Sequence, residues 1–375
     1  MPGFPFTAVL PTALVFASPA LAQTYVVDVN VGPGFDYQQI RGAALHAPDG
    51  ATLIVRPGVY APFTIDGKGL TILADPGVTV AHNPLASDTE IRNTGPAQRT
   101  VLRGLAFERQ LVVRNCDGPV LLEDATFLPG GLFNAYTAHL HVNLCDQVFV
   151  RGIDNGGTTL VGTSTVVFED CVLHGLNAYS QGGDQGPGSP GLACYQSDVT
   201  LVDCDVNGGS GVVLPTNQML EAAPAISAIG GRFALLGATV ATAGGGNGIA
   251  TVPVLGVQYV PAPTVPVRID PQVQLATAHP TVADPEFQLT TRPLPHVTGQ
   301  SAAVGATLTA SAPGPIGQFV ILVVGLPGAP IVLPGIDNAF WLDPVVSAWA
   351  AVGVPQTGAP LTGSATIPNS PSFRG

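Results

Sequence analysis

The sequence predicts an all-β protein: a right-handed parallel β-helix with a capping helix near its N-terminus and a small C-terminal β module. Two observations support this class. Short segments rich in β-branched and other apolar residues are separated by Gly/Pro turns along most of the chain. A loose repeat, in which two alternating strands flank a Gly or Asp bend, recurs from about residue 100 to residue 240. Stacked units of this kind bury a core that no single unit could bury.

Composition agrees with this class and disfavours some partners. The 375 residues include 46 Gly and 36 Pro, only 10 % are charged, and 46 % are hydrophobic. A high Gly/Pro content is typical of disordered chains, but here the β-branched clusters favour many strands joined by many turns. The formal net charge of −12 makes nucleic acid and anionic membrane surfaces poor partners.

Residues 1–22 predict export. The stretch is apolar and ends in an Ala-Leu-Ala sequence before Gln23, which matches a small-x-small cleavage site. Pro11 and Pro19 interrupt a segment already short for a bilayer, which argues against a membrane anchor. The stretch has no Lys or Arg, so a disordered start is the competing interpretation. We expect a mature chain from about Gln23, without a transmembrane segment, that is secreted or held at the cell surface.

Residues 37–47 form the expected capping helix. Asp36 is a suitable N-cap, and Gln39 stands three residues later, at capping-box spacing. Phe35 and Ile40 hold the positions of a hydrophobic staple. Four short strands are then expected at 52–56, 63–65, 70–73 and 78–81, with Gly-containing turns between them.

The stretch FDYQQIRGAALHAPDGATLIVRPGVY resembles the N-terminal entry of right-handed parallel β-helix proteins of the pectin-lyase-like group. The resemblance covers the cap and the first coils, so it concerns the fold. It implies that a carbohydrate-active enzyme is one class of function to weigh, because that group includes polysaccharide lyases, hydrolases and methylesterases.

The repeat predicts where successive coils turn. Its bends are expected at Gly104, Asp124, Gly152, Asp170, Asp203 and Gly237. We expect four flanking residues to stack inside the coil: Val166, Phe168, Val199 and Leu201. Only 18 residues separate the third and fourth bends, which is tight for a full coil and makes the strand at Val148 the least secure. The two coils around the fifth bend are long, which predicts loops at 174–195 and 207–229 that project from the same flank.

The chain is expected to divide into a β-helix at 23–280, a Pro-rich linker at 281–300 and a β module at 301–375. Apolar runs between Pro/Gly turns predict antiparallel strands in the module, which lacks a closing strand if the chain ends there. The module is similar to Pro/Gly-rich C-terminal modules of secreted bacterial proteins.

Five cysteines lie within the repeat region, and none has C-x-x-C spacing, which disfavours zinc. Cys171 and Cys204 hold the same place in successive copies, and Cys116 and Cys145 form a second candidate pair. Neighbouring strands lie ~4.8 Å apart, within disulfide reach, but parallel side-chain directions are unfavourable. A disulfide and a buried stack of small hydrophobic residues both remain open for each pair. Cys194 is left over.

Catalytic motifs of the pectin-lyase-like enzymes are missing. We find no matching Asp pair with a Gly-His-Gly, and between Leu111 and Val267 the cationic side chains other than His are three Arg. Asp124, Asp170 and Asp203 occupy bends where Gly stands in other copies, which favours turn chemistry over a carboxylate ladder. The remaining catalytic candidates are Glu169, Asp170, His174, Asp203 and Asp205. Two of these carboxyls at suitable separation would be needed for an inverting glycosidase.

His139 and His141 alternate on one face and suit a metal, but no third ligand of suitable spacing is evident. We therefore predict neither a metal nor a cofactor.

The long loop at 174–195 is the expected ligand site. Tyr179, Asp184 and Tyr195 combine aromatic rings, which stack on sugar faces, with a carboxyl group that hydrogen-bonds hydroxyls. His174 is the acid–base group in this bulge. The competing interpretation is a Gly-rich connector without function.

Two classes of function follow. The first is an exported, non-catalytic β-helix that binds a polysaccharide or a cell-surface glycan, as in adhesion. The second is a carbohydrate-active enzyme, a polysaccharide hydrolase or lyase, which only the fold favours. The missing motifs and the low charge favour the first. The oligomeric state is left open by the sequence.

Overall fold

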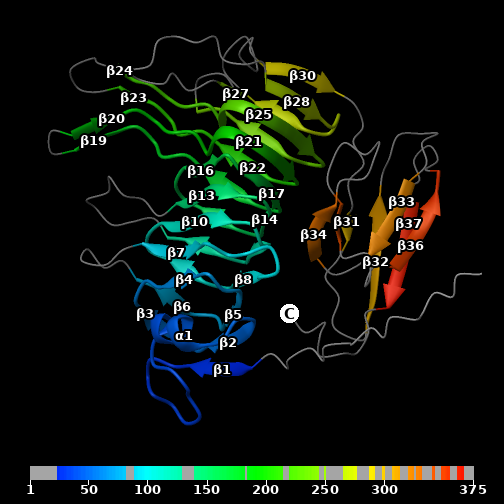
Figure 1. The fold of residues 1–375 in the computed structure, drawn as a ribbon. Helices are drawn as coiled ribbons and strands as arrows, with labels where there is room; N and C mark the ends of the chain where they lie inside the picture. The colour runs from blue at the N-terminus through cyan, green and yellow to red at the C-terminus, as the bar shows by residue number, and fades with distance from the viewer. Residues whose placement is uncertain are drawn as a thin grey trace, which may run out of the picture.

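The computed structural model describes residues 23–81, 88–128, 139–181, 184–213, 219–244, 249–250, 265–276, 287–291, 298–299, 306–312, 320–324, 327–331, 340–342, 348–354 and 361–366. The predicted signal peptide lies outside these residues. The chain forms a parallel β-helix followed by short antiparallel strands (Figure 1). The predicted fold class is therefore confirmed.

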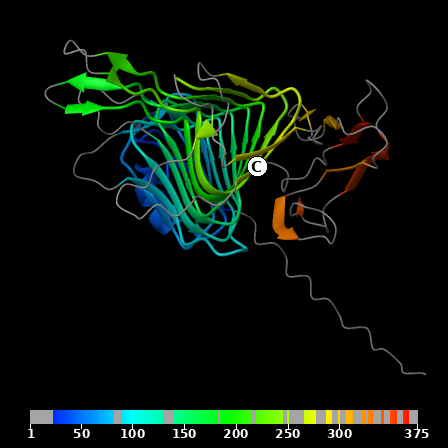
Figure 2. The ribbon, with the colours of Figure 1, turned by 90° about the horizontal axis from the view of Figure 1, so that it is seen from above.

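Each coil adds one strand to each of three parallel faces, named here after the strands of one coil: the β10 face, the β11 face and the β12 face. The coils stack in chain order (Figure 1), and the view from above looks down the stack (Figure 2). The β10 and β11 faces join into one 17-stranded sheet, because β21 and β25 run through the corner between them, and the β12 face is a 9-stranded sheet.

The strands of the β10 face are β4 (Thr64–Asp66), β7 (Thr89–Arg92), β10 (Leu111–Cys116), β13 (Leu140–Cys145), β16 (Thr159–Gly162), the first halves of β21 (Leu192–Val202) and β25 (Ile226–Leu236), and β27 (Ile249–Ala250). Those of the β11 face are β1 (Thr24–Val27), β2 (Ala51–Val55), β5 (Leu70–Ala74), β8 (Thr100–Arg103), β11 (Val120–Glu123), β14 (Val148–Arg151), β17 (Thr165–Glu169), the second halves of β21 and β25, β28 (Val265–Ile269) and β30 (Phe287–Thr291). Those of the β12 face are β3 (Gly58–Tyr60), β6 (Val78–Val80), β9 (Ala106–Phe107), β12 (Thr126–Phe127), β15 (Asp154–Asn155), β18 (Val172–His174), β22 (Asp205–Asn207), β26 (Val240–Thr242) and β29 (Gln274–Ala276).

The corner from the β11 face to the β12 face, called the second bend, is where the sequence predicts Gly or Asp. All six predicted bend residues have a positive φ, between 51° and 75°. Gly adopts this left-handed conformation without a steric penalty, and Asp tolerates it better than most residues do. The Asp203 carboxylate also accepts a hydrogen bond of 2.7 Å from the Ala238 amide in the next coil. The bend carboxylates thus have the structural role that the repeat predicts.

The corner from the β10 face to the β11 face, called the first bend, has its own left-handed residue in each coil. Those that are not Gly are Asn93, Asn115, Leu144, Thr163 and Gln196, with φ between 45° and 57°. The sequence did not predict this series, because Leu and Thr rarely adopt a positive φ.

The predicted interior is confirmed. Val166 lies opposite Val199 and Phe168 lies opposite Leu201, and each of these side chains is at most 2 % exposed. The insecure strand at Val148 also has the expected register, between Val120 and Val166. A full coil therefore fits in the 18 residues between Gly152 and Asp170.

The capping helix is shorter than predicted. Helix α1 spans Ile40–His46, and Gln39 at its N-cap makes no side-chain cap bond. The capping-box prediction is wrong, because both polar side chains bind elsewhere. The Asp36 carboxylate accepts a hydrogen bond from the Val26 amide of β1, and Gln39 accepts one from the Ala61 amide. Phe35, the expected staple residue, is 36 % exposed.

The part of the chain expected to be a linker contributes a strand: β30 pairs in parallel with β28 and continues the stack. The antiparallel strands beyond it are β31 (Thr298–Gly299), β32 (Thr307–Ala312), β33 (Val320–Val324), β34 (Pro327–Ile331), β35 (Phe340–Leu342), β36 (Ala348–Gly353) and β37 (Leu361–Thr366). They pair as β31–β32–β37, β33–β36 and β34–β35, which agrees with a small antiparallel module.

Candidate functional site

Both predicted cysteine pairs are in register on neighbouring coils. Cys116 lies opposite Cys145 at the first bend, and the amide that follows Cys204 donates to the Cys171 carbonyl at the second bend. All five cysteines are buried free thiols in the structure. The thiol contact lowers the pKa of Cys116 to about 7 and raises the pKa of Cys145. A disulfide at either pair stays a prediction.

These thiols share a structural task. Each of the four contacts the carbonyl oxygen two residues before it, with sulfur–oxygen distances of 3.1–3.3 Å. At the first bend, Ser164 and Ser197 hold the place of Cys116 and Cys145 in the next two coils. Their hydroxyls donate to the carbonyl oxygens two residues before them, at 2.7 and 2.8 Å. Cys116 and Cys145 are therefore members of a buried first-bend series of donors in which Ser and Cys replace one another, whereas Cys171 and Cys204 make the same kind of contact at the second bend.

The predicted catalytic residues form two separate sets. At the second bend, Asp203 is bonded to the Ala238 amide and Asp170 lies 3.9 Å from Arg151. Glu169 is half-buried on the outside of β17. Burial raises its pKa, the nearby Arg151 opposes this, and Asp170 and Asp203 raise it further.

The second set lies on the β12 face. Asn207 donates to the Asp205 carboxylate at 3.0 Å, and its amide nitrogen lies 3.5 Å from Nδ1 of His174. Thus His174 and Asp205 are linked through an amide rather than to each other. No contact in the described residues joins this set to Glu169.

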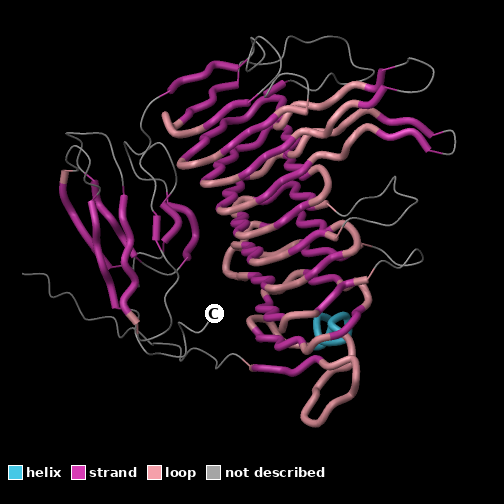
Figure 3. The backbone as a smooth tube through the Cα atoms, turned by 180° about the vertical axis from the view of Figure 1, so that it is seen from behind, coloured by secondary structure: helices cyan, strands magenta, loops and turns pink. Residues whose placement is uncertain are grey.

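The two long loops predicted to project do so from one corner, between the β12 and β10 faces, which we call the loop corner. In consecutive coils they form the antiparallel hairpins β19 (Tyr179–Gln181) with β20 (Asp184–Gly186), and β23 (Val212–Val213) with β24 (Met219–Leu220). They lie side by side in two views (Figures 1 and 3). Tyr179 pairs with Gly186 and Asp184 pairs with Gln181. The side-chain positions of Tyr179 and Asp184 lie outside the described residues.

Glycine explains how the hairpin bases stack. A Cβ at Gly175 would overlap the Ser189 carbonyl oxygen, and one at Gly209 would overlap the Leu176 carbonyl oxygen. The Gly209 amide donates to the Ser189 carbonyl, and the Gly209 carbonyl accepts from the Ala223 amide, both at 2.9 Å. The glycines permit this close backbone approach. At their bases, these loops are therefore built parts of the stack rather than loose connectors.

The strands that leave the hairpins carry Tyr195, the third predicted ligand residue. It faces outward on the β10 face and is 49 % exposed. Gly162 is its partner on the neighbouring strand, and Asn143 is the partner of Gly162. Because Gly162 has no side chain, nothing from that position covers the tyrosine ring.

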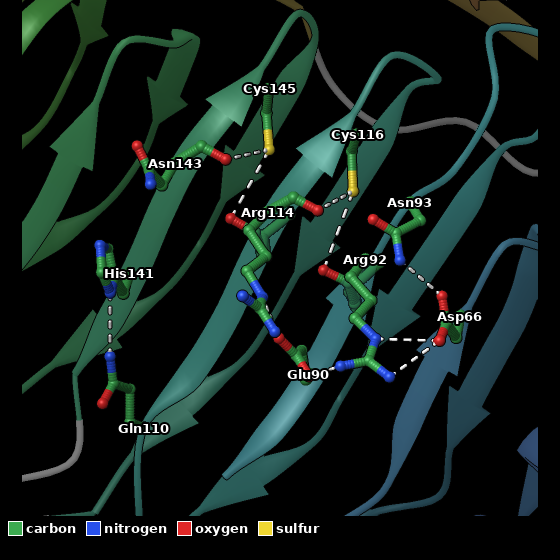
Figure 4. A network of polar contacts seen from close by, with 12 residues as sticks. Asp66, Glu90, Arg92, Asn93, Gln110, Arg114, Cys116, His141, Asn143 and Cys145 are labelled. Atoms are coloured by element: carbon green, nitrogen blue, oxygen red, sulfur yellow. Dashed lines mark hydrogen bonds and ion pairs between the residues drawn. The ribbon is translucent and has the colours of Figure 1, made fainter.

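On earlier strands, the same outward row and the outward row beside it carry a charged network (Figure 4). Glu90, only 15 % exposed at its side chain, forms ion pairs with both Arg92 and Arg114. Arg92 also lies 2.8 Å from the Asp66 carboxylate, which accepts a further hydrogen bond from Asn93. These bonds from Asn93 and Arg92 lower the pKa of Asp66.

His141 lies in the adjacent outward row, which also contains Glu90 and Val112. Its Nδ1 is 3.2 Å from the Gln110 amide nitrogen. Burial lowers its pKa, and His139 lowers it further, so the ring is neutral at neutral pH. In the described part of the chain, no three His, Cys, Asp or Glu side chains are placed to hold a metal ion.

The sequence search missed Glu90, Arg92, Arg114, Asn143 and Gly162. The available signal was the period-2 alternation of β7, β10, β13 and β16, whose outward positions fall into rows once the strands are placed in register. The register itself was not predicted in this region.

Comparison with protein-family models, with curated proteins and with solved structures found no match. The parallel β-helix is therefore established by the strand pairing alone, and the pectin-lyase-like resemblance has no further support. Among the described residues, no helix has the length and apolar character to span a membrane.

Proposed function

We propose that this protein is an exported, non-catalytic glycan-binding β-helix, and that the glycan lies on the β10 face where β16, β21 and β25 leave the loop corner. The observation that carries the proposal is the exposed ring of Tyr195, with Gly162 beside it and the Asn143 side chain lying over Gly162. An aromatic ring stacks on a sugar face, and the neighbouring Asn143 amide suits hydroxyl groups.

The hairpins support this location. β21 and β25 each begin a few residues after a hairpin, and the hairpin that carries Tyr179 and Asp184 is the one joined to β21, the strand of Tyr195. Stacked backbone at their bases fixes where they leave the coil. A ligand site on loops held by a rigid scaffold is a common arrangement.

Contacts of the three Asp candidates support binding rather than catalysis. Asp203 holds the next coil, Asp170 lies near Arg151, and Asp205 accepts from Asn207. Each carboxylate thus has a structural partner, while a general acid or base needs a free position facing the substrate. The alternative, a polysaccharide hydrolase or lyase using His174, is tested below.

A binding titration decides the proposal. We expect the wild type to bind glycans on an array, and Tyr195→Ala to weaken binding about tenfold, since an aromatic stacking contact contributes about 1 kcal/mol or more. Tyr195→Phe keeps the ring and should retain binding. Phe35→Ala, which removes an exposed aromatic side chain near the N-terminal end, is the matched control.

Tyr179→Ala and Asp184→Ala test whether the hairpin takes part. If no glycan binds the wild type, or if Tyr195→Ala and Phe35→Ala bind alike, the proposal is wrong. Release of reducing sugars that His174→Ala abolishes would establish the enzyme alternative instead. Export is tested separately: N-terminal sequencing of the protein secreted by its host should return a start near Gln23, and a start at Met1 would contradict it.

A further inference from the structure

The outward row that contains Tyr195 also contains two arginines. Arg92 on β7 lies opposite Arg114 on β10, and Arg114 lies opposite Asn143 on β13. Two adjacent guanidinium groups beside a sugar-binding surface would attract carboxylate- or sulfate-bearing chains, because guanidinium pairs with such groups through two parallel hydrogen bonds.

In this structure the two guanidinium groups are already occupied. Glu90 sits in the adjacent outward row, forms an ion pair with each of them, and is itself shielded, with 15 % of its side chain exposed. The Asp66 carboxylate forms a second ion pair with the Arg92 guanidinium, with a nitrogen–oxygen distance of 2.8 Å. Two carboxylates thus balance two arginines, and the network has no net charge to offer a ligand (Figure 4).

The rest of the face has no charge that could replace them. From β13 to β25 the two outward rows consist of uncharged residues: His141, Asn143, Leu160, Gly162, Ala193, Tyr195, Ser227 and Ile229. Between Arg114 and Arg232 the sequence has one Lys or Arg, Arg151, which lies on the β11 face. The two segments that carry the hairpins, 175–191 and 208–225, contain no Lys or Arg and two acidic residues, Asp184 and Glu221.

We infer that the site takes uncharged polysaccharide chains, and that Glu90 keeps acidic chains out by holding Arg92 and Arg114. The inference rests on the proposed glycan site and adds the chemical class of its ligand. The net charge of −12 acts in the same direction, because a polyanionic chain would be repelled during its approach.

The test compares two ligand classes on two proteins. Wild type and Glu90→Gln are titrated with neutral polysaccharides (xylan, β-glucan and galactomannan) and with polygalacturonate, at low and at high salt. Glutamine keeps the size and hydrogen-bonding ability of the side chain but removes its charge. We expect the wild type to bind a neutral chain at least about tenfold more tightly than polygalacturonate.

Glu90→Gln should gain about tenfold in affinity for polygalacturonate at low salt and lose that gain at high salt, as screening requires. Adding Arg114→Gln to Glu90→Gln should remove the gain. Glu123→Gln is the matched control: Glu123 lies between Arg103 and Arg151 on the β11 face, so the substitution changes the net charge equally at another surface. The affinity of Glu123→Gln for polygalacturonate should equal that of the wild type.

Thermal unfolding of each variant shows that it is folded, and Glu90→Asp, which keeps the charge, should behave as wild type does. Wild-type binding of polygalacturonate as tight as that of neutral chains overturns the inference and leaves glycan binding intact. Equal gains in Glu90→Gln and Glu123→Gln overturn the role of Glu90. No binding of any glycan by the wild type overturns the neutral-ligand assignment together with the proposed function.

Discussion

The second bend and the loop corner turn the same coils by opposite means. At the second bend, one residue with a positive φ closes every coil from Gly104 to Gly237, and the connection between the flanking strands is always two or three residues long. At the loop corner, the connection ranges from a few residues between β15 and β16 to the two hairpins. The constant corner sets the register of the stack, while the variable corner can accept new sequence because register does not depend on it.

The largest loss of stability is expected from a substitution in the buried core, on which both corners pack. Leu201 lies between Phe168 and Leu235 in the stack and is fully buried. Leu201→Asp would bury a carboxylate without a partner and lower the free energy of unfolding by at least about 3 kcal/mol. Urea denaturation measures this. Val202→Asp, one residue on and facing outward, is the control; equal losses would show that the interior is misassigned.

Asp203→Ala tests the second bend. Alanine is strained at φ 52°, and the bond to the Ala238 amide is lost, so the free energy of unfolding should fall by about 2 kcal/mol. Asp203→Gly loses the same bond but tolerates the conformation, and it should cost less. Thermal unfolding of both variants checks this order. Equal losses would mean that backbone conformation does not determine the residue here.

Gly209→Ala tests the loop corner. The added methyl group would overlap the Leu176 carbonyl oxygen and force the hairpin bases apart, at a cost of about 1–2 kcal/mol. Hydrogen exchange should rise in the two hairpins and stay unchanged at the second bend. Gly156→Ala is the control, because its Cβ would lie 3.6 Å from the Phe127 carbonyl oxygen and fit. Faster exchange along the whole stack would contradict a separation of the two corners.

Glu169→Gln has the smallest expected effect and concerns charge at the second bend. Burial raises the pKa of Glu169 in the folded protein, so between the ordinary glutamate pKa and this raised value the folded state binds more protons than the unfolded state. The free energy of unfolding therefore falls as pH rises through that window. Glutamine does not titrate, so Glu169→Gln should gain stability over wild type as pH rises. A constant difference in stability from pH 4 to 8, measured by urea denaturation, would contradict this.

How far the sequence predicted the fold depended on which residue types mark a turn. All six second-bend positions were predicted correctly because Gly and Asp are the residue types that favour a positive φ. The first-bend series was missed because Leu144 and Thr163 adopt the same conformation without any such mark. There, hydrogen bonds from the buried Cys or Ser that follows hold the turn, and these depend on the stacked neighbours.

The candidate site was predicted only in part, for a similar reason. Tyr195 was named from its loop, but its partners Gly162 and Asn143 come from earlier coils, and only the strand register brings them together. Asp36 shows the reverse: its local context favours a helix cap, yet the amide of Val26, ten residues earlier, takes its carboxylate. In both cases the sequence pattern identified the residue but not its partner, because strand pairing rather than the local sequence brings the two together.

The 18 residues from Gly152 to Glu169 have a consequence for protein engineering. They supply β15, β16 and β17, one strand for each face, with no inserted loop. Both ends of this unit meet the same left-handed joint, since Gly152 and Asp170 hold equivalent bends. The unit can therefore be duplicated to lengthen the solenoid by one coil, and each copy would bring a fresh insertion point between β15 and β16 where a chosen peptide can be grafted.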